Sequence, residues 1–378
     1  MVIYLDYNAT TPVAPEVLAA MLPFFADHFG NAASAHAPGW YAHEAVEAAR
    51  ADVAALVHAE ASEVVFTGGA TEALNLALRG TLEAYASKGR HLVAAATEHR
   101  AVLDTAAALE RDGAVVTVVP VRPDGTLDPD RFADALRPDT VVAAAMAANN
   151  ETGVLHDLAP LAEACRRRGV LFLVDATQAA GKIPVDFAHA DVLALSAHKL
   201  YGPKGIGALI VRRRGPRVAL VEQMTGGGHE RGRRSGTLNV PGIVGFGAAA
   251  RLAANRLDDE AARLAAMLDA MERRLVDETG ATVNGAGAPR LPNTLNLAFP
   301  GVSAERLLSR LSGRLALATG SACSSASKQP SYVLTAMGVS PDVARSSVRI
   351  SLGAPTTNDD AETATALLVD AVRAERAL

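Results

Sequence analysis

Short apolar runs alternate with amphipathic segments through the first two thirds of the chain. The runs lie at 63–67, 91–96, 114–119, 141–147, 170–175, 191–196 and 207–211. Their residues are apolar at nearly every position instead of at every second one, which is typical of strands buried on both faces. Alternation of such strands with helices favours a parallel sheet. We therefore predict an α/β fold whose large domain has a mainly parallel sheet covered by helices on both faces.

Three of the intervening segments have the apolar spacing of helices, at 15–29, 39–57 and 158–169. The third ends in three arginines and a glycine, as expected at a helix C-terminus. Cys165 lies in it, with Leu161 and Ala162 as apolar neighbours at helical spacing. We interpret Cys165 as a packed, inert thiol.

A long helical pattern runs from about Val240 to Glu278. The chain has 378 residues, whereas single hydrophobic cores stop growing at roughly 250 to 300 residues. We interpret the long pattern as a bridge to a second domain. We predict a large domain over 16–255 and a smaller α+β domain that combines 1–15 with 256–378.

Composition excludes several classes of function. Apolar residues make up 49%, charged residues 20%, and the net charge is -5, so there is no overall positive charge to attract nucleic acid. The first residues, "MVIYLDYNATTP", lack the pattern of a signal peptide, and the longest apolar runs are far shorter than the roughly 20 residues of a membrane span. Two cysteines provide no disulfide framework. We expect a cytoplasmic protein with no membrane partner and no metal site.

Polar residues follow the predicted strands at the points where the strands end. The turn "TGGATEALNLAL" follows the first run, and the amides of Ala70 and Thr71 are placed to hold a phosphate at a helix N-terminus. The polar residues at later strand ends are His99, Asn149, Asn150, Asp175 and Gln178. In an open parallel sheet, ligands bind beyond the carboxyl ends of the strands, so we expect these side chains to converge.

Lys199, in "SAHKLYGPKG", stands at the end of the sixth run. Taken alone, such a lysine most often extends to water. However, Asp175 closes an apolar strand and needs a cationic or hydrogen-bond-donating partner there. An amine, a carboxylate, an imidazole and a phosphate cradle at one sheet edge suit pyridoxal 5'-phosphate. We therefore predict that Lys199 binds this cofactor.

Several motifs together cover nearly the whole chain. They are "YLDYNATTP", "FTGGATEALNLA", "TEHRAVL", "NNETG", "VDATQAAGKIPVD", "SAHKLYGPKGIG", "GGGHERGRRSGTLN" and "GSACSSAS". In these motifs the chain resembles the group I, NifS/IscS-like cysteine desulfurases, in the class V aminotransferase branch of the fold type I enzymes that use pyridoxal phosphate.

The resemblance implies roles for individual residues. Lys199 would be the Schiff-base lysine, Asp175 the partner of the ring nitrogen, and His99 the group stacked on the ring. The residues assigned to the phosphate are Ala70, Thr71, Ser196 and His198. Asn150 and Gln178 are assigned to the ring.

The resemblance also implies a homodimer, in which Thr237 reaches the phosphate bound by the other subunit. Without the resemblance, a solvated basic loop or a weak RNA contact is the less favoured alternative for the neighbouring "HERGRRSG". Arg349 would clamp the substrate carboxylate with its planar fork, and Asn31 would bind substrate. The family usually has proline after this asparagine, whereas Ala32 stands here, which predicts a less rigid turn.

Cys323 lies among small residues in "TGSACSSAS". Few bulky side chains are present to fix such a loop, which favours a thiol that moves; a spare buried cysteine is the alternative. In the family, this cysteine takes sulfur from L-cysteine as a persulfide and delivers it to iron-sulfur scaffold or tRNA-thiolation proteins. The length of the loop favours group I over group II.

Two other functions remain open from the residues alone. A selenocysteine lyase, or another β-eliminating lyase on this scaffold, would tolerate loss of Cys323. A non-catalytic scaffold or regulator would have no need of Lys199, Asp175 and Cys323 together, so the presence of all three argues against it.

Overall fold

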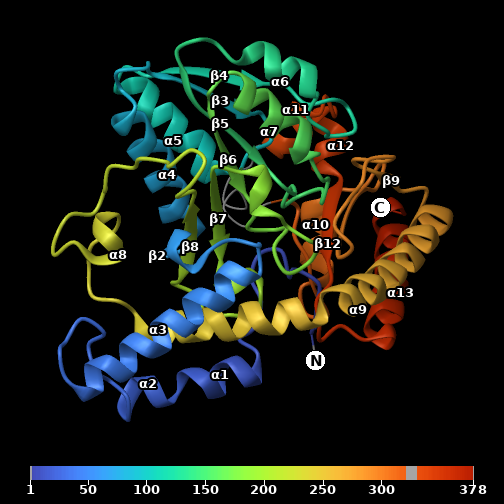
Figure 1. Cartoon of the computed structure of the whole chain (residues 1–378). Helices are drawn as coiled ribbons and strands as arrows, with labels where there is room; N and C mark the ends of the chain where they lie inside the picture. Colours follow the sequence, from blue (N-terminus) through green and yellow to red (C-terminus); the bar gives the residue numbers. More distant parts are fainter. Residues whose placement is uncertain (1, 321–329, 378) are drawn as a thin grey trace.

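The computed structural model describes residues 2–320 and 330–377, so Cys323 lies outside the described residues. Its centre is a seven-stranded sheet (Figure 1). The strands, in their order across the sheet, are β2 (Val64–Thr67), β8 (Gly207–Val211), β7 (Val192–Ser196), β6 (Leu171–Asp175), β5 (Thr140–Met146), β3 (His91–Ala95) and β4 (Val115–Val119). In this sheet β8 alone runs in the direction opposite to the other six strands. The prediction of a mainly parallel α/β sheet is therefore confirmed.

Helices cover both faces of the sheet (Figure 1). One face packs against α4 (Ala70–Ala84) and α5 (Arg100–Arg111). The other face packs against α3 (Ala37–Ala55), α6 (Pro129–Ala135), α7 (Leu158–Arg167) and the first half of α9. Successive strand residues alternate between the two faces, which is why the runs are apolar throughout.

The edge strand β4 differs from the pattern predicted for it. Val115 and Val118 are 46% and 51% exposed, although their run is as apolar as the inner ones. A strand at the edge has one neighbouring strand instead of two, and here the helices do not extend over these side chains. Apolar content therefore identifies the strand but not its place in the sheet.

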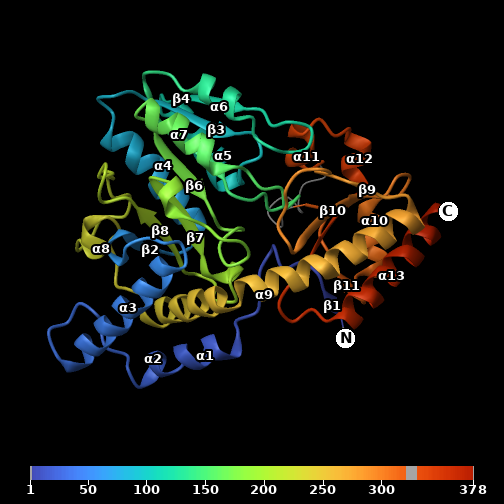
Figure 2. The same cartoon turned by 45° about the vertical axis from the view of Figure 1, so that its right-hand side comes forward.

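The helix predicted from about Val240 to Glu278 is confirmed as α9 (Val240–Thr279). Asn239 caps its start by accepting from the Gly242 amide at 3.1 Å, and Gly280, with φ of 64°, ends it. Its first half packs in the core below the sheet and its second half in a separate core (Figure 2).

The second core contains a three-stranded antiparallel sheet and two helices. Its elements are β9 (Thr282–Val283), β10 (Thr294–Ala298), β12 (Ser347–Ser351), α10 (Ala304–Leu311) and α13 (Asn358–Arg376). The short strand β1 (Ile3–Tyr4) pairs with β11 (Leu315–Ala316), so the start of the chain lies beside this core. The exact domain boundaries stay a prediction.

Shorter helices complete the described chain. They are α1 (Pro15–Met21), α2 (Pro23–Ala26), α8 (His229–Gly232), α11 (Tyr332–Ala336) and α12 (Pro341–Arg345). Across residues 2–320 and 330–377, none of the helices has both the length and the apolar character that a bilayer crossing needs. Cys165 on α7 is fully buried, so its interpretation as a packed residue is confirmed, and burial raises the pKa of its thiol.

Candidate active site

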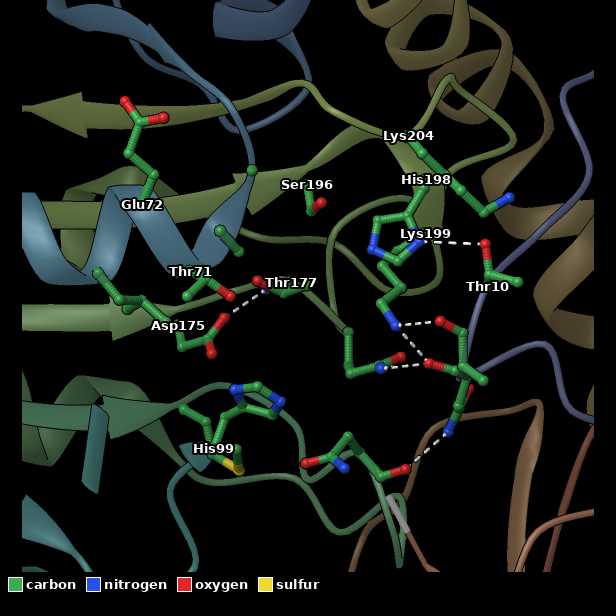
Figure 3. A pocket seen from close by; sticks show the side chains of 18 of the residues that line it. Thr10, Thr71, Glu72, His99, Asp175, Thr177, Ser196, His198, Lys199 and Lys204 are labelled. Carbon is green, nitrogen blue, oxygen red and sulfur yellow. Dashed lines mark hydrogen bonds between the residues drawn. The ribbon is translucent and has the colours of Figure 1, made fainter. Parts of the chain in front are cut away.

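A cavity of about 630 Å³ lies at the carboxyl edge of the central sheet. Residues that follow β2, β3, β5, β6 and β7 line it, together with the turn before β8. Figure 3 shows the side chains of Thr71, His99, Asp175, His198 and Lys199 arranged around a common space. The convergence expected from the strand ends holds for His99, Asn150, Asp175 and Gln178. It was wrong for Asn149, which does not line the cavity and whose Nδ2 donates to the Thr97 carbonyl at 3.1 Å.

Lys199 projects into this cavity from the 3-10 turn η3 (Ala197–Lys199) that follows β7. Its Nζ donates hydrogen bonds to the backbone carbonyls of Asn8 and Ala9, at 2.6 and 2.8 Å. Asn8 is itself fixed, since its Nδ2 donates to Thr294 Oγ1 at 2.8 Å. The amine is held at the wall of the cavity instead of extending into bulk water.

Asp175, the last residue of β6, lies across the cavity from Lys199 (Figure 3). The side chain is buried, and its Oδ1 accepts a hydrogen bond from the Thr177 amide at 2.9 Å. One oxygen is therefore oriented by the backbone of its own turn. A buried carboxylate at this position needs a further cationic or donating partner.

His99 caps the start of α5, where its Nδ1 accepts a hydrogen bond from the Ala101 amide at 3.1 Å. Burial lowers the pKa of His99, and the charge of Lys199 lowers it further, although Asp175 opposes the shift. The ring is therefore neutral at pH 7, with its proton on Nε2. A neutral ring fixed at one nitrogen presents a flat face and one N–H to a ligand.

The turn before α4 exposes backbone donors to the cavity. Gly69 precedes the helix with φ of 149°, and in the described part of the chain no side chain caps α4. A Cβ on Gly207 would lie 2.7 Å from the Gly69 Cα, so the close approach of β8 to this turn requires glycine. The amides of Ala70 and Thr71 thus form a site suited to an anion.

Ser196 and His198 line the same end of the cavity. His198 Nδ1 lies 3.1 Å from Thr10 Oγ1. Burial, followed by the charges of Lys199, Lys204 and Lys182, lowers the pKa of His198 to about 4. His198 is therefore neutral at pH 7 and contributes a hydrogen bond, not a charge.

Arg349 reaches the cavity from β12, in the second core. Its Nη2 lies 2.5 Å from Asp6 Oδ1, and its Nη1 donates to the Asn150 carbonyl at 2.9 Å. Within residues 2–320 and 330–377, the buried Arg349 Nε and Asn150 Oδ1 have no hydrogen-bond partner. Unpaired buried polar atoms beside a cavity indicate a polar ligand.

These residues fit pyridoxal phosphate. Backbone amides, a hydroxyl and a neutral imidazole are available at one end for a phosphate. The Asp175 carboxylate lies opposite the Lys199 amine, and the flat His99 imidazole lies between α5 and the cavity. The unpaired Asn150 Oδ1 remains for the ring, and the unpaired Arg349 Nε leaves a donor for a second, smaller ligand.

Two residues that the sequence analysis assigned to the site do not line this cavity. Thr237 is exposed on the loop that contains α8. Asn31 lies in a separate shallow cavity with Arg50 and Glu230, and its Oδ1 accepts from the Ala33 amide at 2.9 Å. Ala32 packs against the core below the sheet. The roles of Thr237, Asn31 and Cys323 stay predictions.

The structure adds residues that the strand-end argument missed. Asn8 and Thr10 belong to the quoted motif "YLDYNATTP", but nothing in their residue types signals that backbone carbonyls would hold the Lys199 amine. Glu98 is fully buried beside His99, and burial, then the charge of Asp175, raises its pKa to about 8. Lys182 follows Gln178 by four residues, and this spacing was the only signal available for it.

Comparison with known proteins agrees with the site. The family model for class-V aminotransferases matches residues 3–363. A protein named cysteine desulfurase IscS, from an Anaeromyxobacter species, is 54% identical over 377 residues, which cover 98% of this chain and 92% of that relative. The chain belongs to the cysteine desulfurase family.

Solved structures of this family have the same fold. A NifS-like protein matches with a TM-score of 0.91 and 33% identity over the full length of both chains. SspA, solved in complex with cysteine, matches with a TM-score of 0.82 and 35% identity over 92% of this chain and 98% of that one. This cysteine desulfurase therefore has the fold type I architecture expected from its sequence.

Proposed function

We propose that this cysteine desulfurase removes sulfur from L-cysteine, with pyridoxal phosphate bound to Lys199, and forms L-alanine and a persulfide on Cys323. The observation that carries the proposal is the placement of the Lys199 amine, which two backbone carbonyls hold in a cavity opposite the buried carboxylate of Asp175. The cavity volume of about 630 Å³ accommodates both a cofactor and an amino acid.

Three residues act on the reacting part of the cofactor and substrate. When bound, pyridoxal phosphate supplies an aldehyde and an electron-withdrawing ring. Lys199 would hold the aldehyde, and its amine would take up the Cα proton of the substrate. Asp175 would keep the ring nitrogen protonated, and the neutral His99 would lie against the ring.

Other residues orient the ligands. The Ala70 and Thr71 amides, with Ser196 and His198, bind the phosphate at the start of α4. Asn150 and Gln178 bind the ring. Arg349 binds the substrate carboxylate through its guanidinium, since its Nε still lacks a partner in the described part of the chain.

The sulfur transfer conserves atoms and electrons. The Cβ–S bond of L-cysteine breaks and an S–S bond forms to the Cys323 thiolate, while the carbon skeleton gains a proton and leaves as L-alanine. No outside oxidant is consumed in this step. A later thiol or an acceptor protein removes the transferred sulfur from Cys323.

The proposal includes a homodimer, in which Thr237 reaches the phosphate in the neighbouring subunit. The support is that Thr237 is exposed and does not line the cavity of its own chain. We further propose that the protein works in the cytoplasm and passes sulfur to iron-sulfur scaffold or tRNA-thiolation proteins.

The two cysteines of the chain provide a matched test. With L-cysteine and a reductant, the wild-type protein should release equal amounts of L-alanine and sulfide. Cys323→Ser should bind cysteine and change the cofactor spectrum but form no alanine, whereas Cys165→Ala should retain activity, because Cys165 is buried on α7, away from the cavity. Alanine formation by Cys323→Ser at the wild-type rate would favour a β-eliminating lyase instead.

A further inference from the structure

Lys182 occupies a fixed place behind the cavity. The chain after β6 forms successive turns, in which the Ala180 and Ile183 amides donate to the carbonyls of Ala176 and Ala179 at 2.9 and 3.0 Å. Lys182 Nζ lies at the end of these turns and donates a hydrogen bond to Gln178 Oε1 at 2.8 Å.

Gly181 brings this turn close to α9. Its φ is 74°, and a Cβ there would lie 2.7 Å from Leu200 Cδ2 and 3.0 Å from Ala253 Cβ. Only glycine combines this conformation with so close an approach. The backbone conformation and the packing of Gly181 therefore set the position of Lys182, independently of the contacts of its side chain.

The contacts with Lys182 and with the Asn8 carbonyl together fix the orientation of the Gln178 amide. An amide can turn over with almost no change of shape, which exchanges its donor and acceptor ends. An ammonium group only donates, so it selects the orientation with Oε1 toward Lys182. The NH2 group then faces away and donates to the Asn8 carbonyl at 2.9 Å.

The same carbonyl oxygen links this amide to the reactive amine. Asn8 O accepts from Gln178 Nε2 at 2.9 Å and from Lys199 Nζ at 2.6 Å. Gln178 also lines the cavity and is 6% exposed, so its second N–H is available to a ligand there. The turned-over amide would present oxygen instead and would repel an anionic oxygen of a ligand.

The surroundings of Lys182 do not explain it as a structural ion pair. It lines a second, mainly apolar cavity of about 550 Å³, on the other side of Lys199. Two carboxylates line that cavity, but Glu16 pairs with Arg256 and Glu260 with Arg263, and in the described part of the chain Lys182 forms no salt bridge. Burial, then the charges of Lys199 and Arg349, lowers the pKa of Lys182 to about 7. A partly buried ammonium without a carboxylate partner costs stability, which indicates a functional reason to keep it.

We propose that Lys182 is a positioning residue that holds the Gln178 amide with its NH2 group toward the cavity, where this group binds the phenolic oxygen of the pyridoxal ring. The inference rests on the proposed function, because it requires that pyridoxal phosphate occupies this cavity. In this role Lys182 itself touches neither the cofactor nor the substrate.

The test measures binding of pyridoxal phosphate to the apoprotein, together with the visible absorption of the complex. Lys182→Met, which keeps the length of the side chain but cannot donate, should weaken binding about tenfold, the usual effect of losing a charge-assisted hydrogen bond. Lys182→Arg, which still only donates, should bind more tightly than Lys182→Met. Lys88→Met, which removes a lysine that bonds the Gly169 carbonyl far from the cavity, should bind as the wild type does.

A double variant separates positioning from a general structural effect. If Lys182 acts through Gln178, adding Lys182→Met to Gln178→Leu should weaken binding by less than about twofold further. A full tenfold loss in that background, or wild-type binding by Lys182→Met alone, would overturn the inference while the cofactor assignment stands. If the wild-type protein bound no pyridoxal phosphate at all, the proposed function would fail, and this inference would fail with it.

Discussion

The buried ion pair between Arg50 and Glu230 fixes the loop that contains Thr237. Arg50 Nη1 and Nη2 lie 2.7 and 2.9 Å from the Glu230 carboxylate oxygens, and Glu230 Oε2 also accepts from the Phe66 amide at 2.8 Å. The two side chains are only 4% and 2% exposed. Glu230 and Arg231 have φ of 50° and 59°, a left-handed conformation that costs free energy in residues other than glycine. The ion pair offsets that cost.

We predict that Glu230→Ala lowers the free energy of unfolding by about 3 kcal/mol. Removing one member of a buried ion pair costs roughly 3 to 5 kcal/mol, because the other charge is left buried. Arg50 would keep a carboxylate partner in Glu47, at 2.9 Å, and a hydrogen bond to the Val64 carbonyl, so the lower end of that range applies. Urea denaturation followed by circular dichroism measures the change.

Arg231→Ala is the matched control for Glu230→Ala. Arg231 has the same backbone conformation but is exposed, and its Nη1 donates one hydrogen bond to the Ser62 carbonyl at 3.0 Å. Its loss should cost less than about 1 kcal/mol. If Glu230→Ala were no less stable than Arg231→Ala, the ion pair would not be what holds the loop.

Three further predictions follow from buried groups and close contacts. Burial lowers the pKa of His156 to about 4, so the stability due to its neutral ring is complete above its usual pKa of 6.5 and is lost as the pH falls to about 4. His156→Gln should reduce this loss by about 3 kcal/mol, measured as the change in the free energy of unfolding between pH 7 and pH 4. An unchanged loss in the variant would contradict this prediction. Glu98 has a pKa raised to about 8, so its contribution to the free energy of unfolding is complete below about pH 4.5 and is lost as the pH rises through 8. Glu98→Gln should reduce this decline in stability by up to about 5 kcal/mol. An equal decline with pH in both proteins would show that Glu98 is not the group responsible. Gly207→Ala places a Cβ 2.6 Å from the Leu195 carbonyl oxygen and 2.7 Å from the Gly69 Cα, so it should weaken pyridoxal phosphate binding. Gly313→Ala, whose Cβ meets nothing within 4 Å, should not. Equal affinities of the two variants for pyridoxal phosphate would contradict this prediction.

The strands were predictable because each inner strand is buried on both faces and is therefore apolar at successive positions. The same argument does not reveal the order of the strands, since β2 and β8 are far apart in the sequence but adjacent in the sheet. Nor does it separate β4 from the inner strands, because the exposed Val115 and Val118 are the same residue type as buried neighbours.

The site was predictable to the extent that its residues stand at strand ends. Asp175, His99 and Lys199 converge for that reason. The acceptors of the Lys199 amine are backbone carbonyls, whose positions depend on the path of the chain and not on residue type.

A role proposed across subunits, or through another side chain, is harder to predict from the sequence. Thr237 does not line the cavity of its own chain, so only the family resemblance suggested its role. Lys182 touches the site through Gln178, and a lysine four residues after a glutamine is too common to single out.

Borohydride reduction followed by peptide mapping identifies the lysine that holds pyridoxal phosphate. Of the four lysines within residues 2–320 and 330–377, Lys182, Lys199 and Lys204 lie at the cavity or directly behind it. Reduction of the coloured protein should leave a phosphopyridoxyl group on Lys199 alone, and Lys199→Ala should carry none. A label on Lys182 or Lys204 in the wild-type protein, or a label retained by Lys199→Ala, would contradict the assignment of Lys199 as the lysine that binds pyridoxal phosphate.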